Sequence, residues 1–329
     1  MAHRRKKNRN KRKVGVSEEQ LLVMAPFDED LPPQERMDVA VKLSELITRI
    51  ATHIICYTLV DYQELLKDER FSIAHALLQR VTTTHLCNHK LTAEGLVLEY
   101  KGQSFQLHEE YKTMTLTRAV YEHLAMFYFL FEHPKTDEER TIVWKFWQIN
   151  SMKNLLDSSA DDDTSVDSDD GDDDDGPSPQ EKIETLRSEI LSMPLGQQCR
   201  HKLDEWTRVD SRPTNGSIEF IMNDGKYDVR RVTYSQAWKF LFASNDDMTL
   251  LYRHLSMHSH PVYTGLLQYQ SQSGSDQGND GIPLHISSSF LAYLCRLFLK
   301  LIPDGADIVS REFGDHDRRL FRVLAQLPK

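Results

Sequence analysis

One short segment of this chain gathers residue types that could cleave a phosphodiester. It carries a tyrosine, an arginine, three histidines and a serine ahead of a proline: Tyr252, Arg253, His254, Ser256, His258, His260 and Pro261. A histidine can take a proton from a ribose 2′-hydroxyl near neutral pH, and a guanidinium can stabilise charge that builds on phosphate oxygens. These two groups are the minimum chemistry for cutting RNA without a metal ion. The alternative is a polar helix end whose histidines only bond to their neighbours.

The spacing within this segment would group the side chains if it is helical. His254 and His258 are four residues apart and would share one face, while Tyr252, Ser256 and His260 would form a second stripe. Arg253 and His258 would lie about 140° apart around the helix axis. The arginine is long enough to bring its guanidinium near the imidazole of His258 or His260.

A second polar pair lies earlier in the chain, in a helix expected over residues 109–131. Arg118 and Glu122 are four residues apart among aromatic and aliphatic neighbours. An exposed pair at this spacing contributes only about 0.2–0.5 kcal/mol to a helix. Two interpretations stay open: the pair lines one polar pocket with the Arg253 segment, where Arg118, Glu122 and His254 would bind substrate, or it is a buried clamp between helices.

We expect no metal site and no cofactor. His85 and His89 flank Cys87, but zinc needs four ligands and His108 is the only further candidate nearby. The run of aspartates lacks the spacing of a calcium loop. The sequence also lacks a phosphate-cradling glycine-rich loop, a serine-esterase elbow and a zinc-protease motif.

Charge is concentrated in two tracts. Eleven aspartates lie between Asp157 and Asp175, and without them the formal net charge would be +1 in place of −10. Such a tract cannot collapse onto itself, so it predicts a disordered linker. A second interpretation is an autoinhibitor, in which the tract covers a basic surface and competes with nucleic acid. The N-terminal tail has eight Arg or Lys residues between Arg4 and Lys13, which favours binding to RNA or another polyanion. In a eukaryote the same tail would pass as a nuclear import signal.

The composition favours a cytoplasmic protein without a membrane span. The basic tail leads into polar residues, which argues against a signal peptide. The apolar segments 119–131 and 290–302 are too short or too interrupted by charge to cross a bilayer. Four scattered cysteines are typical of reduced thiols.

Hydrophobic periodicity predicts a mostly α protein: a helical bundle split by the acidic linker, with one or two small β-hairpins. Helices are expected over residues 34–67, 72–86, 109–131, 138–156, 180–192, 234–243, 247–258, 287–301 and 317–327. Hairpins are expected at 96–107 and 218–232. The expected organisation is a basic disordered tail (1–33), a helical first half (34–156), the linker (157–179) and a helical second half (180–329).

These motifs resemble those of two families. Arg253 followed by His258 or His260, with a polar residue directly after the arginine, is similar to the Arg-x4–6-His signature of the HEPN superfamily. Arg118-x3-Glu122, together with Tyr252-x3-Ser256-x3-His260-Pro261, resembles the motif pair of a mainly bacterial helical family of unknown function.

The HEPN resemblance implies an RNA-binding protein or a metal-independent endoribonuclease in a toxin, defence or RNA-processing setting, usually a dimer. Arg253 would hold the scissile phosphate, His258 or His260 would act as base and then acid, and Ser256 and Tyr252 would orient it. Other members of that superfamily have lost catalysis and only bind. The rival hypothesis, from a different class, is a non-catalytic helical scaffold that binds a partner protein or a polyanion and uses the Arg, His and Glu cluster only as a buried polar network.

Overall fold

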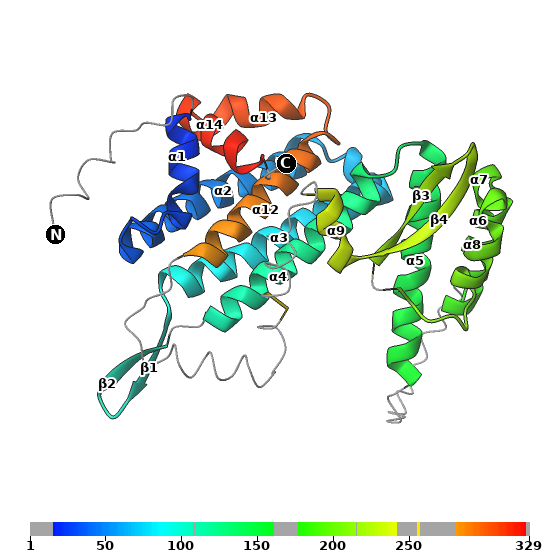
Figure 1. Ribbon diagram of the computed structural model, residues 1–329, viewed down its shortest axis with the longest axis horizontal. Helices are drawn as coiled ribbons and strands as arrows, with labels where there is room; N and C mark the ends of the chain where they lie inside the picture. The colour runs from blue at the N-terminus through cyan, green and yellow to red at the C-terminus, as the bar shows by residue number, and fades with distance from the viewer. Residues whose placement is uncertain are drawn as a thin grey trace. The chain divides into compact units, whose positions relative to one another are not determined.

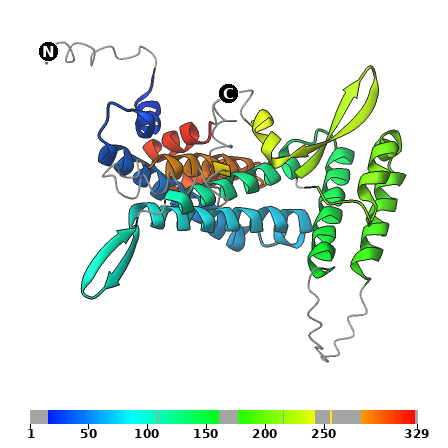
Figure 2. The ribbon, with the colours of Figure 1, turned by 60° about the horizontal axis from the view of Figure 1, so that its bottom comes forward.

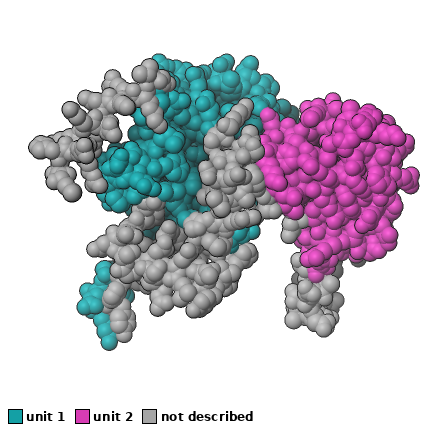
Figure 3. Space-filling model, viewed as in Figure 1, with its two compact units in different colours: residues 1–124, 242–329 teal, residues 125–241 magenta. Residues whose placement is uncertain are grey.

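The structure, a computed structural model, describes residues 16–107, 110–160, 177–214, 216–241, 255–256 and 281–326. These residues are mostly helical, with two antiparallel hairpins, so the predicted fold class is confirmed. The chain forms two compact units: unit 1 contains residues 1–124 and 242–329, and unit 2 contains residues 125–241 (Figure 3). The expected linker 157–179 lies mostly outside the described residues, so its role as a linker stays a prediction.

Three long helices pack on one another in unit 1. They are α2 (Pro33–Asp61), α3 (Glu69–Ala93) and α12 (Ile282–Leu299), and each contacts the other two (Figures 1 and 2). A short 3₁₀ turn, η3 (Leu65–Lys67), precedes α3. The stripe of α2 that faces this core has a three-four spacing and is fully buried or nearly so: Leu43, Ile47, Ile50 and Ile54. Burial of this stripe explains why periodicity predicted the helix.

The helix α12 is apolar around most of its circumference. By length and composition it could cross a membrane, and it is the one helix of that kind among the described residues. In this fold 83% of it is buried inside the protein. We therefore interpret α12 as the central core helix of unit 1, since a helix that is apolar all round must be enclosed.

The N-terminal part of the described chain is more ordered than the sequence suggested. Residues within the expected disordered tail form α1 (Glu18–Met24) and the 3₁₀ turn η2 (Ala25–Phe27). A capping box begins α1, because the Ser17 hydroxyl accepts from the Gln20 amide and the Gln20 side chain accepts from the Ser17 amide. Arg319 then donates to Glu19 at 2.5 Å, and this hydrogen bond holds the pKa of Glu19 at about 2.

The partner of α1 is the C-terminal part of the chain. Arg319 belongs to α14 (Asp315–Leu324), which follows α13 (Gly305–Glu312). Helix α14 contacts α1 and α12, and α13 contacts α2. The ion pair thus joins residues 300 positions apart in the sequence.

A β-hairpin follows α3 in the chain. Strand β1 (Leu96–Tyr100) pairs antiparallel with β2 (Gln103–Leu107), as predicted, and extends away from the helices (Figure 2). Its two turn residues, Lys101 and Gly102, both have positive φ, at 50° and 76°. That backbone is typical of the tight turns that match the twist of paired strands.

Unit 2 combines helices with the second hairpin. Its elements are η4 (a π-helical turn, Tyr128–Glu132), α5 (Asp137–Ala160), α6 (Pro179–Ser192), α7 (Pro194–Gln198), α8 (Arg200–Thr207), β3 (Gly216–Asn223), β4 (Lys226–Thr233) and α9 (Tyr234–Leu241). Helix α5 contacts α6, α8 and β3, so it is the centre of this unit. The predicted hairpin is confirmed, whereas α7 and α8 were not predicted.

Candidate functional site

The polar pair predicted from the sequence lies on α4 (Glu110–Phe127), which is mostly in unit 1. The Arg118 Nε donates to the Glu122 Oε1 at 2.8 Å. The side chains are 20% and 33% exposed, so water reaches both. The opposite face of the helix is fully buried at Val120 and Leu124. The pair is therefore a half-buried ion pair that a ligand could contact from the solvent side.

Two neighbours of this pair fix α4 against the core. The Asn88 amide of α3 donates to the Thr117 hydroxyl oxygen at 2.9 Å, and the Thr117 hydroxyl lies 3.0 Å from the Pro283 carbonyl of α12. The ring of Tyr121 packs against that of Phe290, with centroids 5.6 Å apart. Thr117 and Tyr121 are both buried, so the turn that carries Arg118 is held on two sides.

A histidine on the same helix has a defined proton position. The Nδ1 of His123 lies 2.6 Å from the Ala119 carbonyl oxygen. A carbonyl can only accept, so Nδ1 carries the proton and, in the neutral ring, Nε2 is left as an acceptor. His123 is half-buried, and it adds an imidazole to the region of Arg118 and Glu122.

Of the segment 252–261, the structure describes Leu255 and Ser256. Leu255 is 1% exposed and Ser256 is half-buried, and both are helical and belong to unit 1. The other predicted site residues lie outside the described residues: Tyr252, Arg253, His254, His258 and His260. Their convergence on Arg118 and Glu122 therefore stays a prediction. A buried leucine anchors the segment in the same unit as α4.

The two histidines weighed as zinc ligands form a different kind of site. The His85 Nε2 lies 2.9 Å from the Ser44 hydroxyl of α2, and its Nδ1 lies 2.7 Å from the Ser287 hydroxyl of α12. His89 Nδ1 reaches the same Ser44 hydroxyl at 3.0 Å. Within the described parts of the chain, no three His, Cys, Asp or Glu residues are grouped to hold a metal.

Burial keeps His85 neutral. The side chain is fully buried, and desolvation, followed by the neighbouring His89, lowers its pKa to about 3. A neutral ring has one N–H and one acceptor nitrogen, and the two serines can satisfy both. The network therefore ties three helices together, and His85 and its two serine partners are buried away from any substrate.

A second buried histidine lies one turn from the start of α12. His285 is 2% exposed, and its ring packs nearly perpendicular to that of Phe27, with centroids 5.1 Å apart. Desolvation lowers its pKa to about 4. Its Nδ1 has no hydrogen-bond partner among the described residues, which adds to the cost of charging it.

Unit 2 contains a buried lysine that the sequence analysis missed. Lys153 is 1% exposed, and its ammonium donates to the Trp206 carbonyl at 2.8 Å and to the Ser211 hydroxyl at 2.6 Å. Desolvation, followed by repulsion from Arg231, lowers the pKa of Lys153 to about 8. Because this amine is enclosed by protein, it serves packing better than reaction with a substrate.

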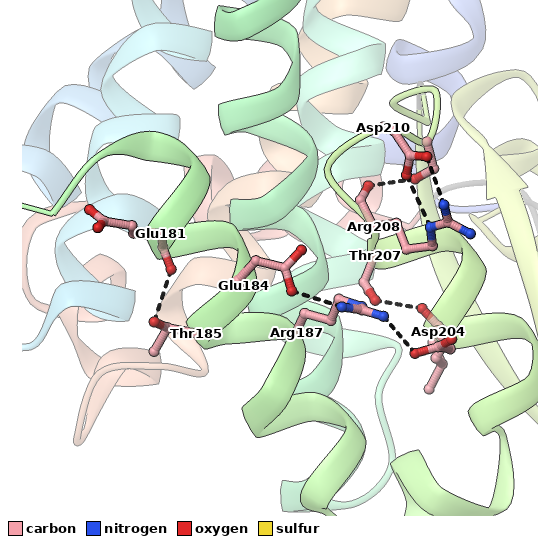
Figure 4. Close-up of polar contacts among 10 residues, drawn as sticks. Glu181, Glu184, Thr185, Arg187, Asp204, Thr207, Arg208 and Asp210 are labelled. Carbon is pink, nitrogen blue, oxygen red and sulfur yellow. Dashed lines mark hydrogen bonds and ion pairs between the residues drawn. The ribbon is translucent and has the colours of Figure 1, made fainter.

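Other polar groups of unit 2 form surface networks. Arg187 of α6 bridges Glu184 at 2.7 Å and Asp204 of α8 at 2.9 Å (Figure 4). His133 lies 3.6 Å from Glu219 beside a cavity of about 20 Å³, which has room for no more than a water molecule. Neither arrangement offers a substrate site.

Comparison with known proteins identifies one family. A family model with the description "Family of unknown function" (DUF5677) matches residues 106–279, which is more than half of the chain. The match includes both the Arg118 helix and the segment 252–261. No curated protein and no solved structure matches the chain.

Proposed function

Because the chain belongs to the DUF5677 family, whose function is unknown, we propose from its residues that it binds RNA and cleaves it without a metal ion, as an HEPN-like endoribonuclease. The observation that carries the proposal is the half-buried, solvent-reachable Arg118–Glu122 pair in the compact unit that also holds Ser256. Water reaches both side chains, so the guanidinium of Arg118 could contact a phosphate while Glu122 holds it in place.

In the proposed reaction, the ribose 2′-oxygen attacks the adjacent phosphorus. His258 (or His260) takes the 2′-hydroxyl proton, and the bond from phosphorus to the 5′-oxygen breaks. The protonated imidazole then returns the proton to the leaving 5′-oxygen. The products are a 2′,3′-cyclic phosphate and a free 5′-hydroxyl. Arg253 would stabilise the charge on the phosphate oxygens in the transition state.

The remaining side chains have supporting roles in this proposal. Ser256 and Tyr252 orient the catalytic imidazole, while Arg118 and His254 contact the RNA backbone and Glu122 fixes the Arg118 fork. The N-terminal basic tail adds sequence-independent affinity for RNA. We propose that the protein acts in the cytoplasm as a homodimer whose two sites face one RNA. Its setting would be defence, toxin action or RNA processing, and a partner protein could restrain its activity.

The test is RNA cleavage by the purified full-length protein in EDTA. Wild type should cut single-stranded RNA and leave 2′,3′-cyclic phosphate ends. Arg253→Ala should abolish cleavage. His258→Ala should also abolish it if His258 is the base, and His260→Ala should abolish it if His260 is the base. His201→Ala is the matched control, because His201 is 65% exposed on α8 in unit 2 and should retain full activity.

Two outcomes would contradict the proposal. Equal cleavage by wild type and all the variants would show that the activity does not come from this segment. Absence of both cleavage and RNA binding in wild type would favour the rival function, a helical scaffold for a partner protein.

A further inference from the structure

A pocket lies in unit 1 among α12, α13 and α14, outside the family-matched residues. Its volume is about 270 Å³. Four basic residues line it: Arg296, Lys300, Arg318 and Arg322. Leu299, Val309 and Phe321 supply an apolar surface between them. The described lining contains no acidic residue, so the pocket combines a positive rim with an apolar wall.

The hydrogen-bonding capacity of these arginines is only partly used. The Nε atoms of Arg296 and Arg318 are buried and have no acceptor among the described residues. Arg296 stacks on the ring of Tyr293, with its guanidinium carbon 4.5 Å from the centroid. Within the described chain, neither Arg296 nor Arg322 forms an ion pair. Buried donors without acceptors are rare in folded proteins, and these two lie beside the pocket, where a ligand could supply an acceptor.

Two carboxylates of the surrounding helices pair with arginines outside the pocket, and a third pairs with one arginine of its lining. Asp317 of α14 lies 3.7 Å from Arg49 of α2, and Glu19 of α1 accepts from Arg319. Asp315 pairs with Arg318, but its own side chain is 74% exposed. The positive charge of the pocket is therefore only partly neutralised by the protein.

We propose that this pocket binds a small phosphate monoester whose organic part is apolar or aromatic. Several guanidinium groups in one pocket favour a dianionic phosphate over a singly charged carboxylate, because arginine matches phosphate oxygens with paired hydrogen bonds. The apolar wall accounts for the organic part. The volume is just below the ~300 Å³ at which pockets for drug-sized ligands begin, which restricts the ligand to a small molecule.

The experiment measures binding of phenyl phosphate to the full-length protein by calorimetry, with inorganic phosphate and benzoate as companion probes. Wild type should bind phenyl phosphate saturably and more tightly than either companion. Arg322→Gln should weaken binding about 10- to 100-fold, the effect of losing one charged hydrogen bond. Arg322 is exposed, so its substitution should leave the fold intact, and Arg296→Gln gives a second measurement.

The matched control is Arg311→Gln. Arg311 lies on α13 but does not line the pocket, and it donates to the Tyr57 hydroxyl at 3.2 Å. Binding should be unchanged in this variant. Three outcomes would overturn the site. The first is no saturable binding by wild type, and the second is an equal loss of affinity in Arg322→Gln and Arg311→Gln. The third is unchanged affinity in both Arg322→Gln and Arg296→Gln. Benzoate binding as tightly as phenyl phosphate would overturn the assignment to a phosphate.

Discussion

His85 and Ser287 are 202 residues apart in the sequence and lie 2.7 Å apart between ring nitrogen and hydroxyl oxygen, which joins α3 to the core helix α12. The hydroxyl of Ser44 on α2 completes the link from the other side of the ring. Because His85 is buried and neutral, the packing of three helices depends on one protonation state.

Stability should therefore fall as the solution becomes acidic. Burial holds the folded pKa of His85 at about 3 and that of His285 at about 4, both below the ordinary 6.5. At a pH between the folded and the ordinary pKa of each histidine, the unfolded chain binds more protons than the folded chain. The free energy of unfolding therefore decreases as pH falls below about 6.5. The slope approaches roughly 1.4 kcal/mol per pH unit for each histidine. Urea unfolding across this range should show a shallower slope for His85→Gln than for wild type; equal slopes would contradict the account.

Removing one serine of the network should cost stability at neutral pH. Ser287→Ala leaves a buried His85 nitrogen without a partner, which costs about 1–3 kcal/mol. Ser192→Ala is the control, since Ser192 is exposed and should change stability by less than about 0.5 kcal/mol. Thermal or urea unfolding measures both. The interpretation fails if the two variants are equally stable.

The buried amine of Lys153 predicts a pH dependence on the alkaline side. Its folded pKa is about 8 and its ordinary value is 10.5, so between these values the unfolded chain binds the extra proton. The free energy of unfolding of wild type should therefore rise with pH in this window, relative to Lys153→Met. The Trp206 carbonyl keeps a bond from Ser211 in that variant. Lys226→Met, at an exposed position, should show no such difference. A constant difference between wild type and Lys153→Met would exclude the effect.

We expect the ion pair of Glu19 and Arg319 to hold α1 against α14. The Arg319 bond lowers the pKa of the Glu19 carboxylate to about 2, so this group stays charged in the folded protein down to about that pH. Its contribution to the free energy of unfolding is complete above about pH 4.5 and declines as pH falls from 4.5 toward 2. Arg319→Gln should speed hydrogen exchange of the α1 amides and leave α2 protected. Arg208→Gln, which removes a surface pair with Asp210 in unit 2, should leave α1 unchanged. Unaltered exchange in Arg319→Gln would show that packing alone holds α1.

The sequence predicted those elements whose own residues carry the signal. The helix α2 has an apolar stripe and the two hairpins have turn residues such as Asp224 and Gly225, so local patterns were sufficient. Helix α13 was missed because its start depends on Asp304, a non-glycine residue with a left-handed φ of 54°, which no periodicity reveals. The order of α1 was missed because Arg319, its ion-pair partner, is 300 residues away.

The candidate site was predictable to a similar degree. The four-residue spacing of Arg118 and Glu122 was sufficient to predict their ion pair, but not its exposure, because burial depends on how α4 packs against α3 and α12. His85 stood out only as a metal ligand, since its serine partners are 41 and 202 residues away. Lys153 gave no signal, because lysine is usually exposed and only the fold reveals its enclosure.

The central claim is that the Arg118 helix and the 252–261 segment form one RNA site. A double-mutant cycle tests it most directly: the affinity of 2′-O-methyl RNA, which lacks the attacking hydroxyl, is measured for wild type, Arg118→Ala, Arg253→Ala and the double variant. If the two arginines contact the same stretch of RNA, the losses should be non-additive by about 0.5–3 kcal/mol. Losses that add to within about 0.5 kcal/mol, or RNA affinity unchanged in both single variants, would contradict a shared site.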